Sequence, residues 1–211
     1  MEYEMNQCVI IGSAPCESDG DFREIDWENS FVICADGGLD LALRQNITPN
    51  LIIGDFDSVK NQLPNNIETI RLQTEKDDTD MMAAIRIAIK RGYRDFILLG
   101  ALGGRFDHSF ANLCAMQFLA AQGCKAMIIG QGCRVFLLNG GRLTLSRLKG
   151  STVSVFPFGT TSCTVTYEGL KYPLTEVRLS ADYPLGVSNL IIAENARVTV
   201  HDGNALIIVL T

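Results

Sequence analysis

The stretch FVICADGGLDLALRQ, residues 31–45, decides the fold class of this chain. It opens with an apolar run of the length and composition typical of a buried strand. It continues through Asp36, Gly37 and Gly38 into a segment with helical apolar spacing. A strand followed at once by a helix is the repeating unit of a parallel sheet covered by helices.

The same alternation runs through the first two-thirds of the chain. Buried strands are predicted at residues 8–11, 31–34, 51–53, 67–72, 96–99 and 126–129, and helices at residues 39–45, 80–91 and 109–122. Gly92 and Gly123 stand where the C-caps of the last two helices belong. We therefore expect an α/β N-terminal domain, residues 1–133, with a mostly parallel sheet flanked by helices.

The last third has a different pattern. Short strands separated by Gly, Asn, Asp and Pro are predicted at residues 135–138, 143–145, 152–156, 163–167, 177–179, 190–192, 198–200 and 205–210. Such a pattern is typical of an all-β sandwich or small barrel. The pattern changes between residues 130 and 141, so the C-terminal domain is placed at residues 134–211.

Composition excludes several classes of protein. The 211 residues carry 24 acidic and 18 basic side chains, a formal net charge of -6, whereas a nucleic-acid-binding protein usually presents a basic face. The apolar runs are too short to span a bilayer, and the N-terminus has no signal-peptide pattern. Seven cysteines without a Cys-x-x-Cys pair favour a reducing, cytoplasmic setting. With only two histidines, any metal is expected to be held by oxygen atoms.

Aspartates recur where the predicted strands end. These are Asp36, Asp55, Asp57, Asp77, Asp78, Asp80 and Asp107. In an open parallel sheet the corresponding loops meet at the carboxyl edge, where ligands bind. Two carboxylates about 4 Å apart repel each other by roughly 4 kcal/mol at a surface-like dielectric. A magnesium ion (Mg2+) among them would remove that penalty, since it takes one or two carboxylates together with phosphate oxygens.

Each of these features also has an ordinary structural explanation. An aspartate at a strand end is common in turns, and Asp80 could cap a helix. The glycine pairs 37–38 and 103–104 could bring backbone N–H groups to a phosphate or could simply form tight turns. Arg105 and Lys76 could contact phosphate or pair with a neighbouring aspartate at the surface.

Taken together, the motifs identify a family. ADGG at 35–38, GDFDS at 54–58, KDDTD at 76–80 and GGRFDH at 103–108, followed by Asn112, resemble the thiamine pyrophosphokinases in order and spacing. The C-terminal motifs GLKYPL at 169–174 and GVSN at 186–189, and the closing strand 205–210, are similar too. Asp78 occupies a position at which the family varies, so it is left out of the predicted site.

The resemblance implies a fold and an activity. The fold is an α/β catalytic domain joined to a β-sandwich that helps to bind thiamine. The activity is Mg2+-dependent transfer of the diphosphoryl group of ATP to the hydroxyl of thiamine, giving thiamine diphosphate and AMP. The resemblance also implies a homodimer with active sites shared between subunits.

The matching positions supply the site residues. Asp55, Asp57 and Asp80 match the magnesium ligands; Asp36, Asp77, Arg105, Asp107 and Asn112 match the nucleotide and phosphate site; and Tyr172, Ser188 and Asn189 match the thiamine side. Gly37, Gly38 and His108 are added to the ATP site, although His108 could equally anchor its own loop. Asp55, Asp57, Asp77, Asp80 and Asp107 form the predicted catalytic set.

The chemistry of these residues is compatible with that reaction. The hydroxyl oxygen of thiamine would attack the β-phosphorus of ATP while Arg105 and the backbone amides of Gly37 and Gly38 offset the remaining charge. Asp77 or Asp107 could accept the hydroxyl proton, and the sequence does not choose between them. An aromatic face at Tyr172 would attract the thiazolium cation by about 0.5–2 kcal/mol. Without the family, Tyr172 is an ordinary strand-edge tyrosine and residues 188–189 are a turn.

Two alternatives remain open. The same edge of the sheet would serve another magnesium-dependent phosphoryl or nucleotidyl transfer to a different small alcohol. A non-catalytic nucleotide or thiamine sensor is a second alternative, but carboxylates facing a triphosphate without a cation would weaken its binding.

Overall fold

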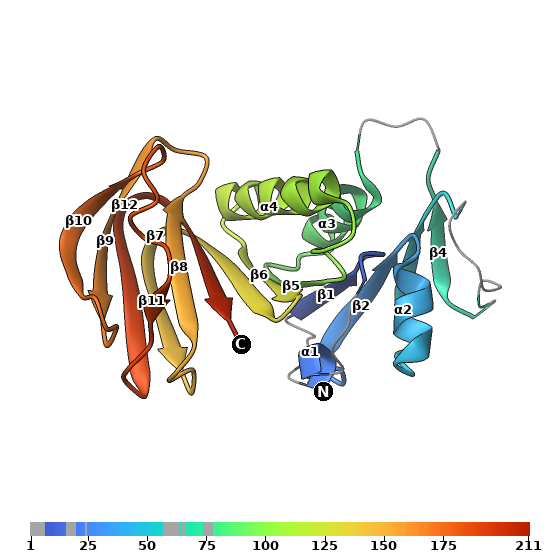
Figure 1. Cartoon of the computed structure of the whole chain (residues 1–211). Helices are drawn as coiled ribbons and strands as arrows, with labels where there is room; N and C mark the ends of the chain where they lie inside the picture. Colours follow the sequence, from blue (N-terminus) through green and yellow to red (C-terminus); the bar gives the residue numbers. More distant parts are fainter. Residues whose placement is uncertain (1–6, 16–19, 24, 57–63, 65, 74–77) are drawn as a thin grey trace. The chain divides into compact units, whose positions relative to one another are not determined.

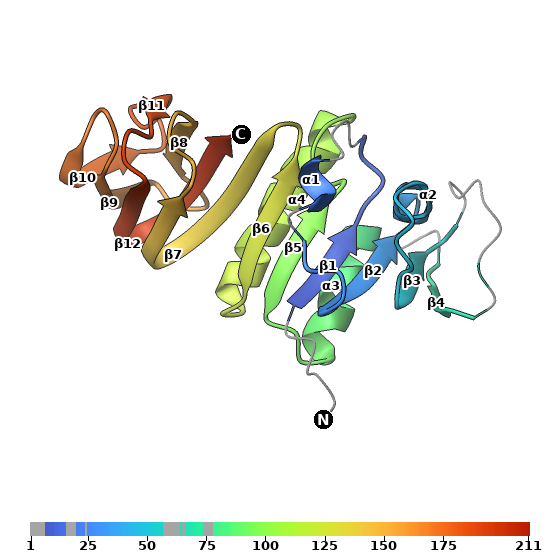
Figure 2. The same cartoon turned by 90° about the horizontal axis from the view of Figure 1, so that it is seen from below.

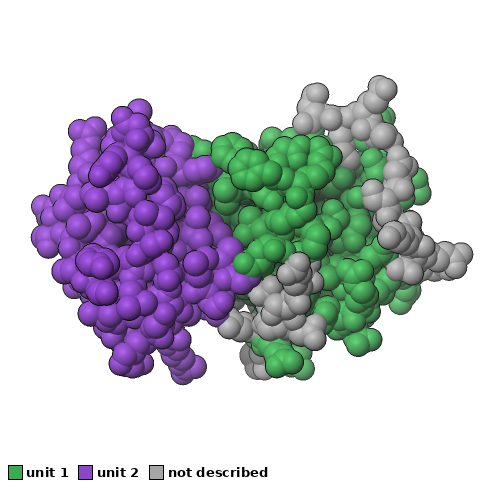
Figure 3. All heavy atoms as spheres, viewed as in Figure 1, with its two compact units in different colours: residues 1–131 green, residues 132–211 purple. Residues whose placement is uncertain are grey.

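The computed structural model describes residues 7–15, 20–23, 25–56, 64, 66–73 and 78–211. The chain divides into two compact units, Met1–Gln131 and Gly132–Thr211 (Figure 3). The predicted metal ligand Asp57 lies outside the described residues, as do Lys76 and Asp77.

Unit 1 is built on a parallel sheet. Its strands are β1 (Gln7–Ile11), β2 (Ser30–Ala35), β3 (Leu51–Gly54), β4 (Glu68–Arg71), β5 (Asp95–Leu99) and β6 (Lys125–Gly130), in the order β6-β5-β1-β2-β3-β4. Each pairing between neighbours in this order is parallel. The strand order reverses direction beside β1, and in such sheets the crevice at the carboxyl ends is where ligands bind.

Helices cover both faces of this sheet. Figures 1 and 2 show α1 (Gly20–Arg23) and α2 (Gly38–Arg44) on one face and α3 (Asp80–Lys90) and α4 (Phe106–Ala121) on the other. Because both faces are covered, the strands are continuous apolar runs rather than alternating ones. Strand β5, for example, is buried from Phe96 to Leu99. The observed parallel sheet and its helices agree with the predicted α/β class.

Helix α3 shows how its sequence produces its ends and its buried face. The side chain of Thr79 accepts a hydrogen bond from the backbone N of Met82 at 3.2 Å, which caps the first turn. Met81, Ala84, Ile85 and Ala88 follow at helical spacing and are all buried. The helix ends before Gly92, whose φ of 98° suits a residue without a side chain.

Two predictions for unit 1 were wrong in detail. Strand β4, expected to be buried, has mostly exposed side chains because it lies at the sheet edge with β3 as its neighbour. Helix α4 begins at Phe106 rather than at residue 109, so the motif at 103–108 contains its first turn. Arg105 is the N-cap in extended conformation, and Asp107 stands in the first turn, where a negative charge is favourable.

Unit 2 is all β. Its strands are β7 (Cys133–Ser146), β8 (Thr152–Pro157), β9 (Ser162–Glu168), β10 (Leu174–Ser180), β11 (Asn189–Leu190) and β12 (Asn195–Leu210). The long β7 and β12 pair antiparallel along most of their length. The first half of β12 also pairs with β9, and the second half pairs with β8. Strand β9 alternates buried and half-buried residues, as expected for a strand with one face on the core.

The sequence prediction divided β7 and β12 into two short strands each, which was wrong. Gly140 and Gly141 lie within β7 with φ of 69° and 92°, and Gly203 lies within β12 with φ of 74°. The β7–β12 register shifts between Val200 and Asn204. Glycines in these positions mark a β-bulge, which bends a strand without ending it.

The core of unit 2 draws on all of the longer strands. Leu145, Val153, Val165, Leu179 and Val198 are among its fully or almost fully buried members. The observed unit agrees with the predicted all-β class of the C-terminal domain. No helix within the described ranges is long and apolar enough to cross a membrane.

Candidate active site

A pocket of about 480 Å3 lies at the carboxyl edge of the unit 1 sheet. The loops that follow β1, β2 and β5 form its walls, together with the first turns of α3 and α4. Its lining residues are Gly12, Ser13, Ala14, Pro15, Ala35, Asp36, Thr79, Asp80, Met81, Gly100, Gly103, Gly104, Arg105, His108, Ala111 and Asn112. This is the position at which an open α/β sheet binds its ligands.

Five of the residues predicted for the site line this one pocket. They are Asp36, Asp80, Arg105, His108 and Asn112. They come from three segments far apart in the sequence, which the parallel sheet brings to the same edge. The pocket therefore combines two carboxylates, a guanidinium and an imidazole around glycine-rich loops.

Asp36 has an unusual backbone conformation. Its φ is 48°, and its backbone N donates to the carbonyl of Ile53 at 2.8 Å. Aspartate is one of the few residues that tolerate this left-handed region, and such conformations cluster at functional sites. A Cβ placed on Gly54 would lie 3.0 Å from the Asp36 Cα, so glycine allows the ends of β2 and β3 to approach closely. The next residue, Asp55, therefore follows β3 at the same edge as Asp36, although it does not line the pocket.

Asn112 holds the loop that follows β5. Its Nδ2 donates to the carbonyl of Ala101 at 2.7 Å. Ser109, one turn earlier on α4, accepts a hydrogen bond from the backbone N of Gly103 at 3.0 Å. The first turns of α4 thus fix the Gly103-Gly104 wall of the pocket.

Arg105 and Asp107 form an exposed ion pair. Arg105 Nη2 lies 2.6 Å from Asp107 Oδ2, and Arg105 Nε donates to Oδ1 at 3.1 Å. The hydrogen bond from Arg105 is the main reason why the pKa of Asp107 lies below its usual range. A carboxylate with a lowered pKa is a weaker base, and Asp107 does not line the pocket. The position of Asp107 outside the pocket lining weighs against it as the proton acceptor.

Glycines at the carboxyl edge of the sheet allow neighbouring backbone segments to approach closely. A Cβ on Gly38 would lie 1.9 Å from the carbonyl oxygen of Ile11, and one on Gly12 would lie 2.7 Å from the carbonyl oxygen of Gly100. Gly37 and Gly38 are not among the described residues that line the pocket. Close packing of α2 against the end of β1 therefore explains Gly38, and the predicted amide contact with phosphate stays a prediction.

Sequence reasoning missed one wall of the pocket, residues 12–15. Gly12 and Ser13 follow β1 directly, so they satisfy the same strand-end criterion that selected Asp36. The other strand ends stand out in the sequence by charged residues or glycine pairs, and residues 12–15 contain neither.

A complete metal site is not formed by the described residues alone. Within residues 7–15, 20–23, 25–56, 64, 66–73 and 78–211, no three His, Cys, Asp or Glu side chains are grouped closely enough to hold an ion. Asp57, one of the three predicted ligands, lies outside these ranges. The donors that are described, Asp36, Asp55 and Asp80, offer the hard oxygen atoms that Mg2+ prefers.

In unit 2, Asn189 and Tyr172 are joined by reciprocal hydrogen bonds. Asn189 Oδ1 accepts from the backbone N of Tyr172 at 3.0 Å and from that of Leu190 at 2.9 Å, while Nδ2 donates to the Tyr172 carbonyl at 2.7 Å. Asn189 is 7% exposed, and the whole of Tyr172 is 60% exposed. Ser188 is exposed, with its backbone N donating to Ser154 Oγ at 3.0 Å. Asn189 thus anchors the backbone at Tyr172, whose side chain faces solvent.

The two units match two family models. The model described as "Thiamin pyrophosphokinase, catalytic domain" matches residues 23–128. The model described as "Thiamin pyrophosphokinase, vitamin B1 binding domain" matches residues 142–205. Together they span most of both units.

Individual proteins are also similar. The chain is 26% identical over 194 residues to "Thiamine pyrophosphokinase" of Bacillus subtilis (strain 168), covering 89% of this chain and 91% of the relative. It is 23% identical over 209 residues to "Thiamine pyrophosphokinase 1" of Oryza sativa subsp. japonica, covering 84% and 78%.

Solved structures resemble the fold over almost the whole chain. The crystal structure of thiamine pyrophosphokinase from Bacillus subtilis has a TM-score of 0.86 at 22% identity, covering 97% of this chain and 99% of that chain. The thiamin pyrophosphokinase from Geobacillus thermodenitrificans has a TM-score of 0.83 at 26% identity, covering 97% of each.

Proposed function

The chain belongs to the thiamin pyrophosphokinase family, and we propose that the pocket of unit 1 is its ATP site. The protein is a thiamine diphosphokinase, which forms thiamine diphosphate from thiamine with ATP as the donor. The observation that carries the proposed site is the grouping of Asp36, Asp80, Arg105 and the Gly103-Gly104 loop in one pocket within the matched catalytic region.

The phosphates of ATP are placed against the Arg105 side of this pocket. Arg105 is exposed and offers up to five N–H donors, so it can exchange Asp107 for phosphate oxygens when the nucleotide binds. His108 and Asn112 lie on the same helix and face the same pocket. Both are proposed as residues of the nucleotide site. Asn112 would act indirectly, by bonding to the loop that follows β5.

Asp55, Asp57 and Asp80 are proposed to hold Mg2+. The cation would neutralise phosphate charge and orient the triphosphate for in-line attack. Asp80 supports this role because it lines the pocket, and Asp55 because it follows β3 at the same edge of the sheet. In the transfer itself the thiamine oxygen attacks the β-phosphorus of ATP. The bond between the β-phosphorus and the oxygen that bridges it to the α-phosphorus breaks, and AMP leaves with that oxygen.

The thiamine hydroxyl must lose its proton during this step. Asp77 and Asp107 are the two candidates for accepting it. Asp107 does not line the pocket, so we propose Asp77 as the proton acceptor. Arg105, once bound to phosphate, would stabilise the charge that develops on the transferred group.

Thiamine is proposed to contact residues 134–211, while residues 1–133 hold ATP and the metal. The exposed ring of Tyr172 can lie against the thiazolium cation, and the hydroxyl of Ser188 can hydrogen-bond the aminopyrimidine. Asn189 is assigned a supporting part, because its amide already bonds to the backbone of Tyr172.

A cytoplasmic homodimer with shared active sites completes the proposal. Cys8, Cys34, Cys114, Cys124 and Cys163 are free thiols, which suits a reducing compartment. Mixing Asp57→Asn subunits, which lack a proposed metal ligand, with Tyr172→Ala subunits, which should bind thiamine weakly, tests the shared site at a low thiamine concentration. Recovered activity in the mixture would support it, and a strictly monomeric active enzyme would contradict it.

An end-point assay by mass spectrometry tests the reaction. Thiamine, ATP and Mg2+ are incubated with the protein, with and without EDTA. The expected result is thiamine diphosphate and AMP in equal amounts, both lost on chelation. Formation of thiamine monophosphate and ADP would indicate that the same site transfers a single phosphoryl group. Product formation in the presence of EDTA would contradict the proposed metal site.

A further inference from the structure

Gln131 is the last residue of unit 1 and directly follows β6. Gly130, Gln131 and Gly132 all have positive φ, of 155°, 55° and 66°. Gln131 is therefore a non-glycine residue in the left-handed region between two glycines. Its side chain makes two contacts with loops of unit 1.

The first contact is a hydrogen bond across the chain. Gln131 Nε2 donates to the carbonyl oxygen of Pro15 at 2.9 Å, a contact between residues 116 positions apart. Pro15 belongs to the pocket wall that follows β1. This hydrogen bond therefore connects the last residue of unit 1 to that wall of the pocket.

The second contact is with the adjacent wall, which follows β5. A Cβ built on Gly103 would lie 2.8 Å from Gln131 Nε2 and 3.0 Å from its Cδ, so the amide of Gln131 lies directly against Gly103. A Cβ on Gly104 would similarly lie 3.2 Å from Pro15 Cδ. Gln131, Pro15 and the Gly103-Gly104 loop thus interlock, and the last two line the pocket.

We propose that Gln131 is a positioning residue that fixes the Gly103-Gly104 wall of the nucleotide pocket relative to its Pro15 wall, because it contacts both. The proposal rests on the assignment of this pocket to ATP. Gln131 does not itself line the pocket, so it acts through the two walls rather than on the nucleotide. It therefore affects how tightly the nucleotide is held more than how fast bound substrate reacts.

Two substitutions separate the parts of this role. Gln131→Met keeps the length of the side chain and its packing on Gly103 but removes the donor to Pro15. Gln131→Ala removes both contacts. Gln122→Met is the matched control, because Gln122 is an exposed glutamine at the C-cap of α4, outside the residues that line the pocket.

The measurements are the Kd of α,β-methylene-ATP, whose bridging carbon blocks diphosphoryl transfer, and the steady-state KM for ATP and kcat. Loss of one hydrogen bond predicts a rise of about 3- to 10-fold in Kd and KM for Gln131→Met. We expect a larger rise in Kd and KM for Gln131→Ala. The kcat of both variants should change by less than about twofold, because a loss of uniform binding raises KM without changing kcat. Thermal unfolding is recorded for every variant, so that loss of fold is separated from loss of affinity.

The outcomes are distinct. Unchanged Kd and KM in both Gln131 variants would overturn the inference alone, as would a fall in kcat at constant KM. Failure of the wild-type protein to bind the analogue would instead overturn the assignment of the pocket to ATP, and the inference with it. A rise confined to the Gln131 variants, with the Gln122 control unchanged, supports it.

Discussion

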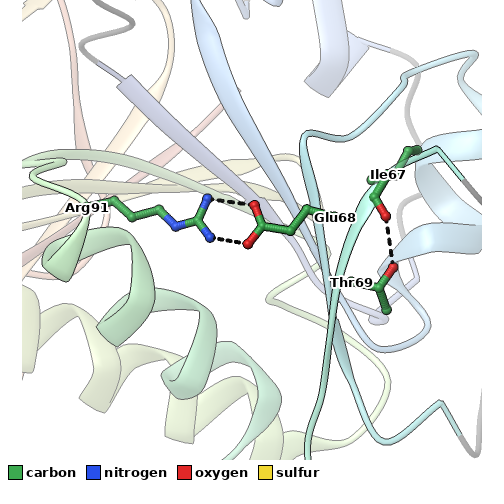
Figure 4. Close-up of polar contacts among 4 residues, drawn as sticks. All are labelled: Ile67, Glu68, Thr69 and Arg91. Carbon is green, nitrogen blue, oxygen red and sulfur yellow. Dashed lines mark hydrogen bonds and ion pairs between the residues drawn. The ribbon is translucent and has the colours of Figure 1, made fainter.

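Arg91, at the end of α3, and Glu68, on the edge strand β4, form an ion pair with two parallel hydrogen bonds (Figure 4). The Arg91 Nη2–Glu68 Oε1 and Nη1–Oε2 distances are 2.5 and 3.0 Å. The guanidinium also lies 5.5 Å above the ring of Phe31 on β2. Because the residues of β4 are mostly exposed, this pair supplies a tie between the edge strand and α3 that apolar packing does not.

Glu68→Gln should lower the free energy of unfolding by about 0.5 kcal/mol at pH 7, because the pair is bidentate but half exposed. The hydrogen bond from Arg91 lowers the pKa of Glu68 in the folded protein. The stabilisation from this ion pair is therefore complete above the pKa of Glu68 in the unfolded chain, about 4.3. It is lost as the pH falls through the lower pKa that Glu68 has in the folded protein. Urea unfolding of both proteins from pH 7 to pH 3 checks this.

The control for that experiment is Glu28→Gln, an exposed glutamate of the same unit. It should leave stability unchanged within error across the pH range. A difference between Glu68→Gln and wild type that persists undiminished at pH 3 would contradict the ion-pair explanation.

Gly38→Ala should be strongly destabilising. Its Cβ would lie 1.9 Å from the carbonyl oxygen of Ile11, and a backbone atom in a β-sheet cannot move aside easily. We expect a loss of about 3 kcal/mol, at the upper end of overpacking effects. Gly37→Ala is the control, since its Cβ would meet only Ser13 Cβ at 3.1 Å and its φ of -60° suits alanine. Equal stability of the two variants, measured by thermal unfolding, would rule out this packing argument.

Asp57→Asn and Asp80→Asn should each reduce kcat/KM by about 100-fold or more, the magnitude seen when one group that stabilises transition-state charge is removed. Asp40→Asn, on the first turn of α2 and outside the residues that line the pocket, should retain activity. Steady-state assays at saturating Mg2+ and circular dichroism of each variant check this. Full activity of Asp57→Asn would remove the metal assignment.

Asn189→Ala should affect stability and thiamine affinity together. The substitution removes the two hydrogen bonds that Asn189 makes with the backbone of Tyr172, each of which contributes about 0.5–1.5 kcal/mol. It should also raise the KM for thiamine, because Tyr172 loses its anchor. Tyr172→Ala serves as the comparison: it should raise the same KM with little loss of stability, since its ring is exposed. Stability of Asn189→Ala equal to that of wild type would exclude the anchoring role.

The alternation of apolar runs and helical spacing was enough to predict the α/β class of unit 1. Strand β5 is an uninterrupted apolar run between turn residues, and α3 has its cap, apolar face and terminal glycine in consecutive order. Exposure of β4 could not be predicted in this way, because burial depends on whether a neighbouring strand lies on both sides. The full lengths of β7 and β12 could not be predicted either. A β-bulge within one strand and a turn between two strands both contain glycine, so composition does not distinguish them.

The amino-acid sequence was sufficient to identify the carboxylate and guanidinium groups of the site and to place them at the ends of strands and the starts of helices. Asp36, Asp80 and Arg105 could be selected because local position along each strand or helix predicts the sheet edge on which they fall. The contacts of each side chain became known from the folded structure: Asn112 bonds to Ala101, Asn189 bonds to Tyr172, and Gln131 bonds to Pro15. Hydrogen bonds act over about 3 Å, so residues that are 11, 17 or 116 positions apart come within reach of each other only after the strands and loops between them have folded.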